Sequence, residues 1–399
     1  MSEFARETEL LYAGDKVGGV DHSPETLPIY QTTAFTSSSL DEVLERYELM
    51  DKGKAYSYIR SGNPNRSATG NIMTFLEHGE ESLVCSSGMG AICGVLFTLL
   101  KAGDHIVYSN CCYGETLEVI NENLADFGVQ STAVNIDNLE EVKTAIRPNT
   151  KIIYTEVVAN PLMRVADIDV LAKMAHDIGA LLIIDNTFTS PFAICPLDHG
   201  ADIVINSLTK FLNGHSDACA GSITGTAEMM GKIKSNISRF GTPCDPYTSW
   251  LVARSLKTAE LRLLRQMENA AKLADALKKD PRIIEVRHPS IKGFSGYETA
   301  KKLFKNDNQI CAMLSFTINT EDYDKRNTFT RALKVAHYAP TLGGVRTTYQ
   351  QPIYSSQNHM PDEERRKIGI TPAMFRVSVG IENVEDLIAD FTNALSAIQ

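Results

Sequence analysis

The sequence offers little that would suit a membrane, a secretory route or a nucleic-acid partner. No stretch approaches the roughly 18 apolar residues of a membrane-spanning helix, and the opening MSEFARETELLYAG lacks the basic-then-apolar order of a signal peptide. Basic residues are in the minority, with 39 Lys and Arg against 49 Asp and Glu, and no long Lys/Arg run occurs. We therefore expect a cytoplasmic protein that binds neither membranes nor nucleic acids.

Cysteine is sparse and scattered. The eight cysteines include no CxxC pair and no zinc-ligand spacing. A chain of 399 residues can bury a core without disulfides. We expect reduced thiols, most of them buried, and no metal site.

The middle of the chain alternates between two kinds of pattern. Short apolar runs predict strands at 105–109, 151–156, 180–188 and 201–208. Helical patterns lie between them, at 139–146 and 169–180. Strands that alternate with helices indicate an α/β domain with a mostly parallel sheet covered on both faces.

The pattern changes after this region. A long Leu/Ala/Arg-rich stretch, about 247–279, has a helical pattern. The runs IIEVRHP, CAMLSFTI and MFRVSVG predict strands before a closing amphipathic helix. We expect three parts: an N-terminal arm at 1–60, a large domain at 61–255 and a smaller C-terminal α+β domain at 256–399.

Three polar groups follow apolar strands, where open α/β sheets bind ligands. They are the Gly-rich turn SSGMGAI (86–92), then Asp185, then Ser207, Thr209 and Lys210. Each alone has a plain structural explanation, because Gly-rich turns are common and strand-end Asp or Lys residues are usually capping or solvated. Together they offer a helix N-terminus for a phosphate, a carboxylate and an amine. Pyridoxal phosphate needs this set, since a lysine forms its Schiff base and a carboxylate keeps its ring nitrogen protonated.

Longer motifs carry a family resemblance over nearly the whole chain. They are PIYQTTAF (28–35), YIRSGNPNR (58–66), SSGMGA (86–91), IIDNTF (183–188), NSLTKFLNGHSD (206–217) and FRVSVGIENVEDLIADFTNAL (375–395). The chain resembles the Cys/Met-metabolism (trans-sulfuration) family of fold-type I pyridoxal-phosphate enzymes. That family includes cystathionine γ-lyase, methionine γ-lyase, cystathionine γ-synthase and O-acyl-homoserine sulfhydrylase.

The resemblance implies a role for each matching residue. Lys210 matches the Schiff-base lysine, which later carries protons, and Asp185 matches the partner of the ring nitrogen. The matching phosphate ligands are Gly88, Met89, Ser207 and Thr209.

Three further residues match groups around the ring and the substrate. Tyr113 matches the aromatic that stacks on the ring and protonates a leaving group, and Asn160 matches the residue near the ring's phenolic oxygen. Arg376 matches the clamp of the substrate α-carboxylate, for which a guanidinium fork is suited. The plain alternatives are a core tyrosine, a turn-starting asparagine and a paired structural arginine. We expect His215, beside the lysine loop, to be structural.

Two residues of the arm match contacts to a neighbouring subunit. Tyr58 and Arg60 correspond to residues that reach the partner's phosphate in the family. The resemblance therefore implies a homodimer with shared sites, commonly a dimer of dimers.

The residues expected to face the substrate side chain differ from those usual in the family. Glu115 stands where cysteine or glycine is usual, Glu118 where an arginine is usual, and the SLGG.E motif reads TLGGVR, with Thr341 and Arg346. Pro340 and Gln357 depart as well. Two readings of Glu115 stay open: it binds a cationic group of the substrate, such as the distal amine of cystathionine, or it pairs with Arg346.

These features favour a carbon–sulfur lyase that eliminates at Cγ or Cβ of L-cystathionine, L-methionine or a related thioether. The alternative within the family is a γ-replacement transferase, which shares the same intermediate. An alternative of another class is a non-catalytic protein that binds pyridoxal phosphate.

Overall fold

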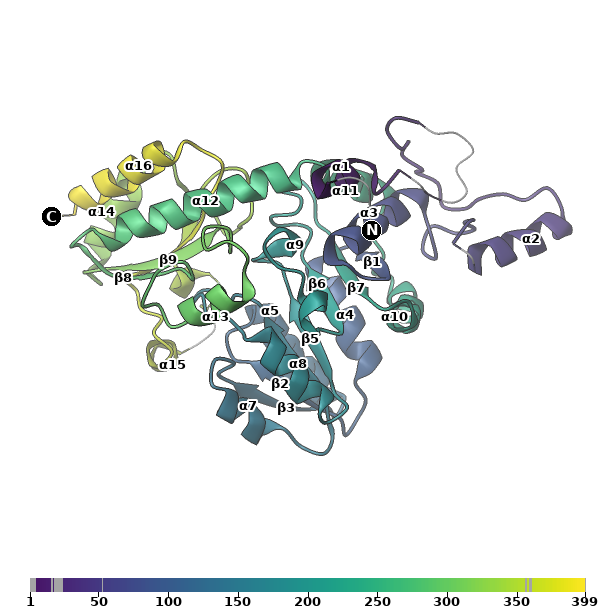
Figure 1. Ribbon diagram of the computed structural model, residues 1–399, viewed down its shortest axis with the longest axis horizontal. Coiled ribbons are helices and arrows are strands. Elements are labelled where there is room, and N and C mark those ends of the chain that lie inside the picture. The colour runs from purple at the N-terminus through teal and green to yellow at the C-terminus, as the bar shows by residue number, and fades with distance from the viewer. Residues whose placement is uncertain are drawn as a thin grey trace.

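Figure 1 shows the computed structural model, which describes residues 5–15, 17, 24–51, 53–355, 357–358 and 361–398. The strands are β1 (Glu81–Cys85), β2 (His105–Ser109), β3 (Gln130–Val134), β4 (Thr150–Glu156), β5 (Leu181–Asp185), β6 (Ile203–Asn206), β7 (Gly221–Gly225), β8 (Ile283–Arg287), β9 (Met313–Ile318), β10 (His337–Tyr338), β11 (Thr348–Gln350) and β12 (Met374–Ser378). None of the helices in these ranges combines the length and apolarity that crossing a bilayer requires.

The helices fall before, between and after these strands. The first group is α1 (Arg6–Tyr12), α2 (Leu40–Asp51), α3 (Pro64–Glu77), α4 (Gly88–Leu99), α5 (Gly114–Glu118), the π-helical turn η1 (Val119–Asn123), α6 (Leu124–Asp126), α7 (Leu139–Ala145), α8 (Ile168–His176), α9 (Ser190–Ala193), the 3₁₀ turn η2 (Pro196–His199) and α10 (Ala227–Phe240). The second group is α11 (Pro246–Leu256), α12 (Ala259–Lys278), α13 (Tyr297–Leu303), α14 (Tyr323–Ala332), the 3₁₀ turn η3 (Pro352–Tyr354), α15 (Asp362–Lys367) and α16 (Val384–Ser396).

The large sheet has seven strands in the order β1-β7-β6-β5-β4-β2-β3. The run from β3 to β6 is parallel, and β7 is antiparallel to both of its neighbours. The predicted α/β class, with a mostly parallel sheet, is confirmed. The sheet places the carboxyl ends of β4, β5 and β6 side by side, which is where the site forms.

Alternate side chains of the central strands enter two different cores. In β5, Leu182 and Ile184 join one apolar cluster and Ile183 joins the other, while in β4 Ile153 and Ile152 divide in the same way. Helices α3, α8, α11 and α12 contribute to the first cluster, and α4 and α10 to the second. A strand covered on both faces needs apolar residues on both, which is why these strands read as continuous apolar runs.

The smaller sheet, β10-β11-β12-β9-β8, lies at the other end of the molecule. Four phenylalanines (Phe316, Phe329, Phe375 and Phe391) form its core, and the Phe316 and Phe375 rings stack with centroids 5.5 Å apart. Helix α12 joins the two parts, because Leu263 packs in the first core of the large sheet and Leu277 packs in the core of the small one (Figure 1).

The helical pattern at about 247–279 forms two helices, because the chain breaks between α11 and α12. The carbonyl of Ser255, near the end of α11, accepts a hydrogen bond from Arg262 Nη2 (3.1 Å). The same guanidinium also donates to the carbonyls of Phe211 (3.0 Å) and Leu212 (2.9 Å), in the lysine loop. A contact between segments 50 residues apart leaves no trace in the helical periodicity.

Helix α2 stands away from both sheets in Figure 1. It presents large apolar side chains to solvent, including Leu40 (83% exposed) and Leu44 (65%). A helix of this length without tertiary packing is marginal in water, so the arm lacks a core of its own.

Candidate active site

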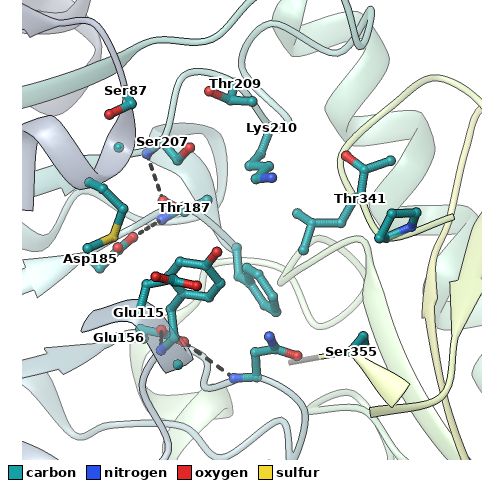
Figure 2. Close-up of a pocket in the computed structure, with 18 of the residues that line it drawn as sticks. Ser87, Glu115, Glu156, Asp185, Thr187, Ser207, Thr209, Lys210, Thr341 and Ser355 are labelled. Atoms are coloured by element: carbon teal, nitrogen blue, oxygen red, sulfur yellow. Dashed lines mark hydrogen bonds between the residues drawn. The ribbon is translucent and has the colours of Figure 1, made fainter. Parts of the chain in front are cut away.

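A cavity of about 450 Å³ lies where the large sheet meets the smaller one (Figure 2). Its floor comes from the ends of β4, β5 and β6 and from the start of α4. Its opposite wall comes from residues 340–342, Gln350, Ser355, Asn358 and Arg376. Every predicted site residue lines this cavity except Tyr58 and Arg60. The polar groups that the sequence placed after strand ends therefore line one pocket.

One end of the pocket is built to receive an anion. Ser87 caps α4 by accepting the N–H of Gly90 (2.9 Å), and the first N–H groups of a helix, here those of Gly88 and Met89, have no intrahelical acceptor. A Cβ added to Gly88 would lie 2.9 Å from the Ser207 side chain, so only glycine permits this approach. Together with the hydroxyls of Ser207 and Thr209 these donors fit a phosphate.

The floor carries a buried carboxylate, Asp185. Its Oδ1 accepts the backbone N–H of Thr187 (2.9 Å), and Thr187 Oγ1 in turn accepts the N–H of Ser207 (2.8 Å). Burial raises the pKa of Asp185 above its usual value, while the bonds from Thr187 lower it. A buried carboxylate with no cation beside it favours a cationic ligand group at this point.

Lys210 enters the pocket from the loop after β6 (Figure 2). Burial, and then the nearby charge of Arg376, lower the pKa of its amine below the usual range. A depressed pKa increases the fraction of free amine, which is the form that attacks a carbonyl or accepts a proton.

Arg376 lies on β12, buried in the opposite wall. Its Nη1 donates to Asn160 Oδ1 (3.2 Å) and its Nη2 to the carbonyl of Thr341 (3.4 Å). Gln350 is its register partner on β11. In the amide orientation that satisfies both the oxygen and the nitrogen, the Gln350 oxygen accepts from Arg376 Nη1 (2.8 Å) and Nη2 (2.5 Å), and the nitrogen donates to Ser355 Oγ (3.2 Å). Burial lowers the pKa of Arg376 to about 10, so it stays charged at neutral pH.

The mouth of the pocket is open and acidic. Tyr113, which precedes α5, is 44% exposed, and Glu115 is exposed as well. Burial, and then the charges of Glu115 and Glu118, raise the pKa of Tyr113, so its phenol keeps its proton at neutral pH. The mouth therefore combines exposed carboxylates with a phenol that keeps its proton.

The structure separates Glu115 from Arg346. Glu115 lines the pocket, whereas Arg346 is exposed and lies outside its lining, and no ion pair joins them within the described chain. His215 and Gln357 also lie outside the pocket lining. His215 Nδ1 lies 2.7 Å from the carbonyl of Asn213 and 3.2 Å from Ser255 Oγ.

Sequence reasoning missed several polar residues that line the pocket, and two of them contact predicted site residues or their loops. Glu156 ends β4 beside Asp185, and Gln350 supports Arg376. The rule that singled out Asp185 and Lys210, a polar residue at the end of an apolar strand, finds Glu156 in KIIYTE as well. Gln350 has no such signal, because strand register across the small sheet brings it to Arg376.

One cluster of metal-ligand types forms away from the pocket. The ligand atoms of His78, Cys195 and Asp198 lie within 4.8 Å of one another, although sequence spacing showed no metal site. Burial raises the pKa of Cys195 to about 12, so its thiol keeps its proton at neutral pH, and His78 is hydrogen-bonded to Asp198 (2.8 Å). We assign no metal to this cluster.

Comparison with known proteins identifies the group to which the chain is related. The sequence pattern of the Cys/Met metabolism PLP-dependent enzymes matches residues 7–396. The chain belongs to this family. The family membership and the cofactor, pyridoxal phosphate, are confirmed, and the pocket of this Cys/Met-metabolism enzyme fits that cofactor with an anion cradle, a buried carboxylate and an amine.

Individual relatives of this Cys/Met-metabolism enzyme cover most of its length. An L-methionine γ-lyase of Fusobacterium nucleatum is 40% identical over 375 residues, 93% of each chain. A cystathionine γ-lyase of Bacillus subtilis is 35% identical over 98% of this chain and 100% of its own. The crystal structure of cystathionine γ-lyase from Lactobacillus plantarum, complexed with L-serine, superposes with a TM-score of 0.90 at 33% identity, covering 99% of this chain and 100% of that one.

Proposed function

We propose that this enzyme is a carbon–sulfur lyase that eliminates the sulfur substituent of L-cystathionine or L-methionine, giving a 2-oxo acid, ammonia and a thiol. The observation that carries the proposal is the meeting of Lys210, Arg376 and Tyr113 in one pocket with the cofactor cradle. A protein that only bound pyridoxal phosphate would need the cradle and Asp185, but neither a carboxylate clamp nor a proton donor at the mouth.

Each residue has a task that its surroundings support. Bound pyridoxal phosphate supplies an electron sink that acidifies the substrate carbon. Arg376 holds the α-carboxylate with its planar fork, oriented by Gln350 and Asn160. Lys210, with its lowered pKa, takes and returns protons at the α- and β-carbons. Tyr113 keeps its phenolic proton and donates it to the departing sulfur.

A product assay tests the proposal. The purified enzyme is incubated with L-cystathionine, L-methionine, L-cysteine, and O-acetylhomoserine plus sulfide, and 2-oxo acid, ammonia and thiol are measured. We expect 2-oxo acid and ammonia in equal amounts from cystathionine or methionine. Homocysteine from O-acetylhomoserine and sulfide, without 2-oxo acid from any substrate, would instead establish the γ-replacement transferase.

We further propose that the active site is completed by a second copy of the chain, in a dimer or a dimer of dimers. Tyr58 and Arg60 are exposed on the arm, with the Arg60 guanidinium 5.7 Å from the centre of the Tyr58 ring. Neither lines its own pocket, and α2, in the same arm, exposes Leu40, Leu44 and Tyr47 to solvent. In this proposal both residues reach the phosphate of the partner subunit.

Subunit mixing tests the shared site. We expect Arg60→Ala and Lys210→Ala chains to be nearly inactive on their own, whereas a hybrid dimer would hold one site in which both residues are intact. We expect mixing to restore part of the activity. Activity that stays at the parental level, while subunit exchange is demonstrated by tagged chains, rules the shared site out.

The eight cysteines are all unpaired, and most are buried. Free thiols are typical of reducing compartments. They support a cytoplasmic location, which fractionation of the host cell would test.

A further inference from the structure

Two buried carboxyl groups stand side by side on the floor of the pocket. Glu156 and Asp185 end the neighbouring parallel strands β4 and β5 and are register partners. Their side chains line the same pocket, and the two residues are 7% and 9% exposed. The cofactor presents one cationic ring nitrogen, so the second carboxyl group has no counterpart in it.

No cation neutralises the pair in the described chain, and Cys112 and Tyr154 lie close to it. Burial first, and then the charges of the two carboxyl groups, raise the pKa of Cys112 and Tyr154 well above their usual values. Lys210 and Arg376 are the cations that line the pocket, and neither forms an ion pair with Glu156 or Asp185 in the described chain. Two uncompensated charges on adjacent buried strands repel each other strongly, so the pair favours a single charge.

Glu156 holds two loops at once. Its Oε1 accepts the backbone N–H of Tyr113 (2.7 Å), and its Oε2 accepts that of Asn160 (3.3 Å). One loop carries the ring-stacking tyrosine to the pocket mouth, and the other carries the asparagine that supports Arg376. The 2.7 Å bond is the shorter and therefore the stronger of the two.

We propose that Glu156 is a positioning residue that works as a neutral carboxyl group: it fixes the loops of Tyr113 and Asn160 and leaves Asp185 as the one ionised carboxylate for the cofactor ring. Burial, and then the charge of Asp185, raise the pKa of Glu156 well above its usual value, which agrees with this assignment. The carbonyl oxygen of a neutral carboxyl group still accepts the Tyr113 N–H.

The proposal rests on the proposed cofactor chemistry, and its test separates charge from hydrogen bonding. Glu156→Gln keeps the carbonyl acceptor and replaces the O–H by an N–H donor, so it mimics the neutral form. Glu156→Ala removes both. Asp185→Asn is the matched control, which removes the charge that the ring nitrogen needs.

The measurements are the dissociation constant of pyridoxal phosphate, followed by fluorescence titration of the full chain, and the pH profile of the bound cofactor's absorbance. For Glu156→Gln we expect a dissociation constant within about threefold of wild type and an unchanged pH profile, because no charge is lost. For Glu156→Ala we expect binding weaker by about tenfold or more, because the buried N–H of Tyr113 is left unpaired. Asp185→Asn should shift the pH profile.

Two results overturn the proposal. If Glu156→Gln weakens binding and shifts the pH profile as Asp185→Asn does, Glu156 is ionised and serves as a charge. If Glu156→Ala binds the cofactor like wild type, the two loops do not depend on it. Should Glu156→Ala fail to fold, the comparison of Glu156→Gln with Asp185→Asn decides alone. These readouts do not require turnover, so a failure of the proposed lyase activity leaves them valid.

Discussion

The floor and the mouth of the pocket are built in opposite ways. On the floor, Asp185 and Ser207 are joined through Thr187, and Glu156 ties two loops, so hydrogen bonds hold these groups in place. At the mouth, Glu115 and Tyr113 are exposed, and Glu115 has no ion pair in the described chain. The floor is preorganised for one cofactor, whereas the mouth is free to differ between enzymes that share it. Substrate choice is therefore expected to depend on the residues at the mouth. Their contacts come from a second subunit or from the substrate itself.

The largest effect is expected on the floor, from Lys210→Ala. Loss of a positioned proton carrier costs about 10²–10⁴-fold in turnover, and loss of the covalent link to the cofactor adds to this. Activity with every substrate should disappear, while the phosphate cradle still retains some pyridoxal phosphate. Borohydride reduction of wild type followed by peptide mapping is the control, and a label on any other lysine contradicts the assignment.

Arg376→Lys, in the wall between floor and mouth, should come next. Lysine keeps the charge but loses the planar fork, and a charge-assisted hydrogen bond is worth enough for a roughly 10- to 100-fold loss in kcat/KM. The loss should be similar for all substrates, because all carry the α-carboxylate, and the cofactor absorbance should not change. A near-normal KM would show that the carboxylate binds elsewhere.

Glu115→Gln tests the mouth directly. If Glu115 receives the distal ammonium of cystathionine, kcat/KM for cystathionine should fall about three- to tenfold, a modest effect because the carboxylate is exposed. Methionine, which lacks that charge, should be unaffected. Arg346→Met serves as the control and should be silent, since Arg346 lies outside the pocket lining. Equal losses on both substrates would contradict the recognition of a distal ammonium.

The last effect concerns stability rather than activity, and it comes from Glu77, which lies behind the floor of the pocket. Glu77, fully buried on α3, accepts hydrogen bonds from Asn206 Nδ2 (2.6 Å) and Asn186 Nδ2 (3.0 Å), the residues beside Ser207 and Asp185. Burial raises its pKa to about 7 from an ordinary value of 4.5, partly opposed by these two bonds. The folded state therefore keeps a proton that the unfolded chain has lost, and stability falls as pH rises from about 4.5 to about 7.

Glu77→Gln removes this titration. Relative to wild type the variant should gain stability as pH rises through that window, by up to about 3 kcal/mol, or a few degrees in Tm. The measurement is thermal unfolding of both proteins between pH 5 and 8. A difference in Tm that stays constant with pH would show that Glu77 has an ordinary pKa.

The sequence predicted the residues on the floor of the pocket more completely than the arrangement at its mouth. Asp185 and Lys210 each follow an apolar strand, and the parallel arrangement brings strand ends together, so their meeting could be expected from local pattern alone. The same rule could have found Glu156. The exposure of Glu115 and its separation from Arg346 could not be read from the sequence, because both depend on where α5 lies relative to the segment after β10.

The break between α11 and α12 is a feature of the fold that, in the same way, could not be predicted from the sequence. Local propensity favours a continuous helix there, and the bonds from Arg262 to the carbonyls of Ser255 and Leu212 come from tertiary packing. Strands β10 and β11 were also missed, since two or three residues carry too little periodicity to detect.

The sequence by itself determined the fold class, because apolar periodicity is a local property that repeats along the chain. It indicated the cofactor through residues at strand ends, and the family through the resemblance of its longer motifs. Only the tertiary structure decided which polar groups touch. It put Glu156 beside Asp185, turned Gln350 toward Arg376 and left Glu115 facing the open pocket. These relations depend on strand register and on the approach of the two sheets. They are set by packing between segments that are far apart in the sequence. Asn160 and Arg376, for example, are 216 residues apart.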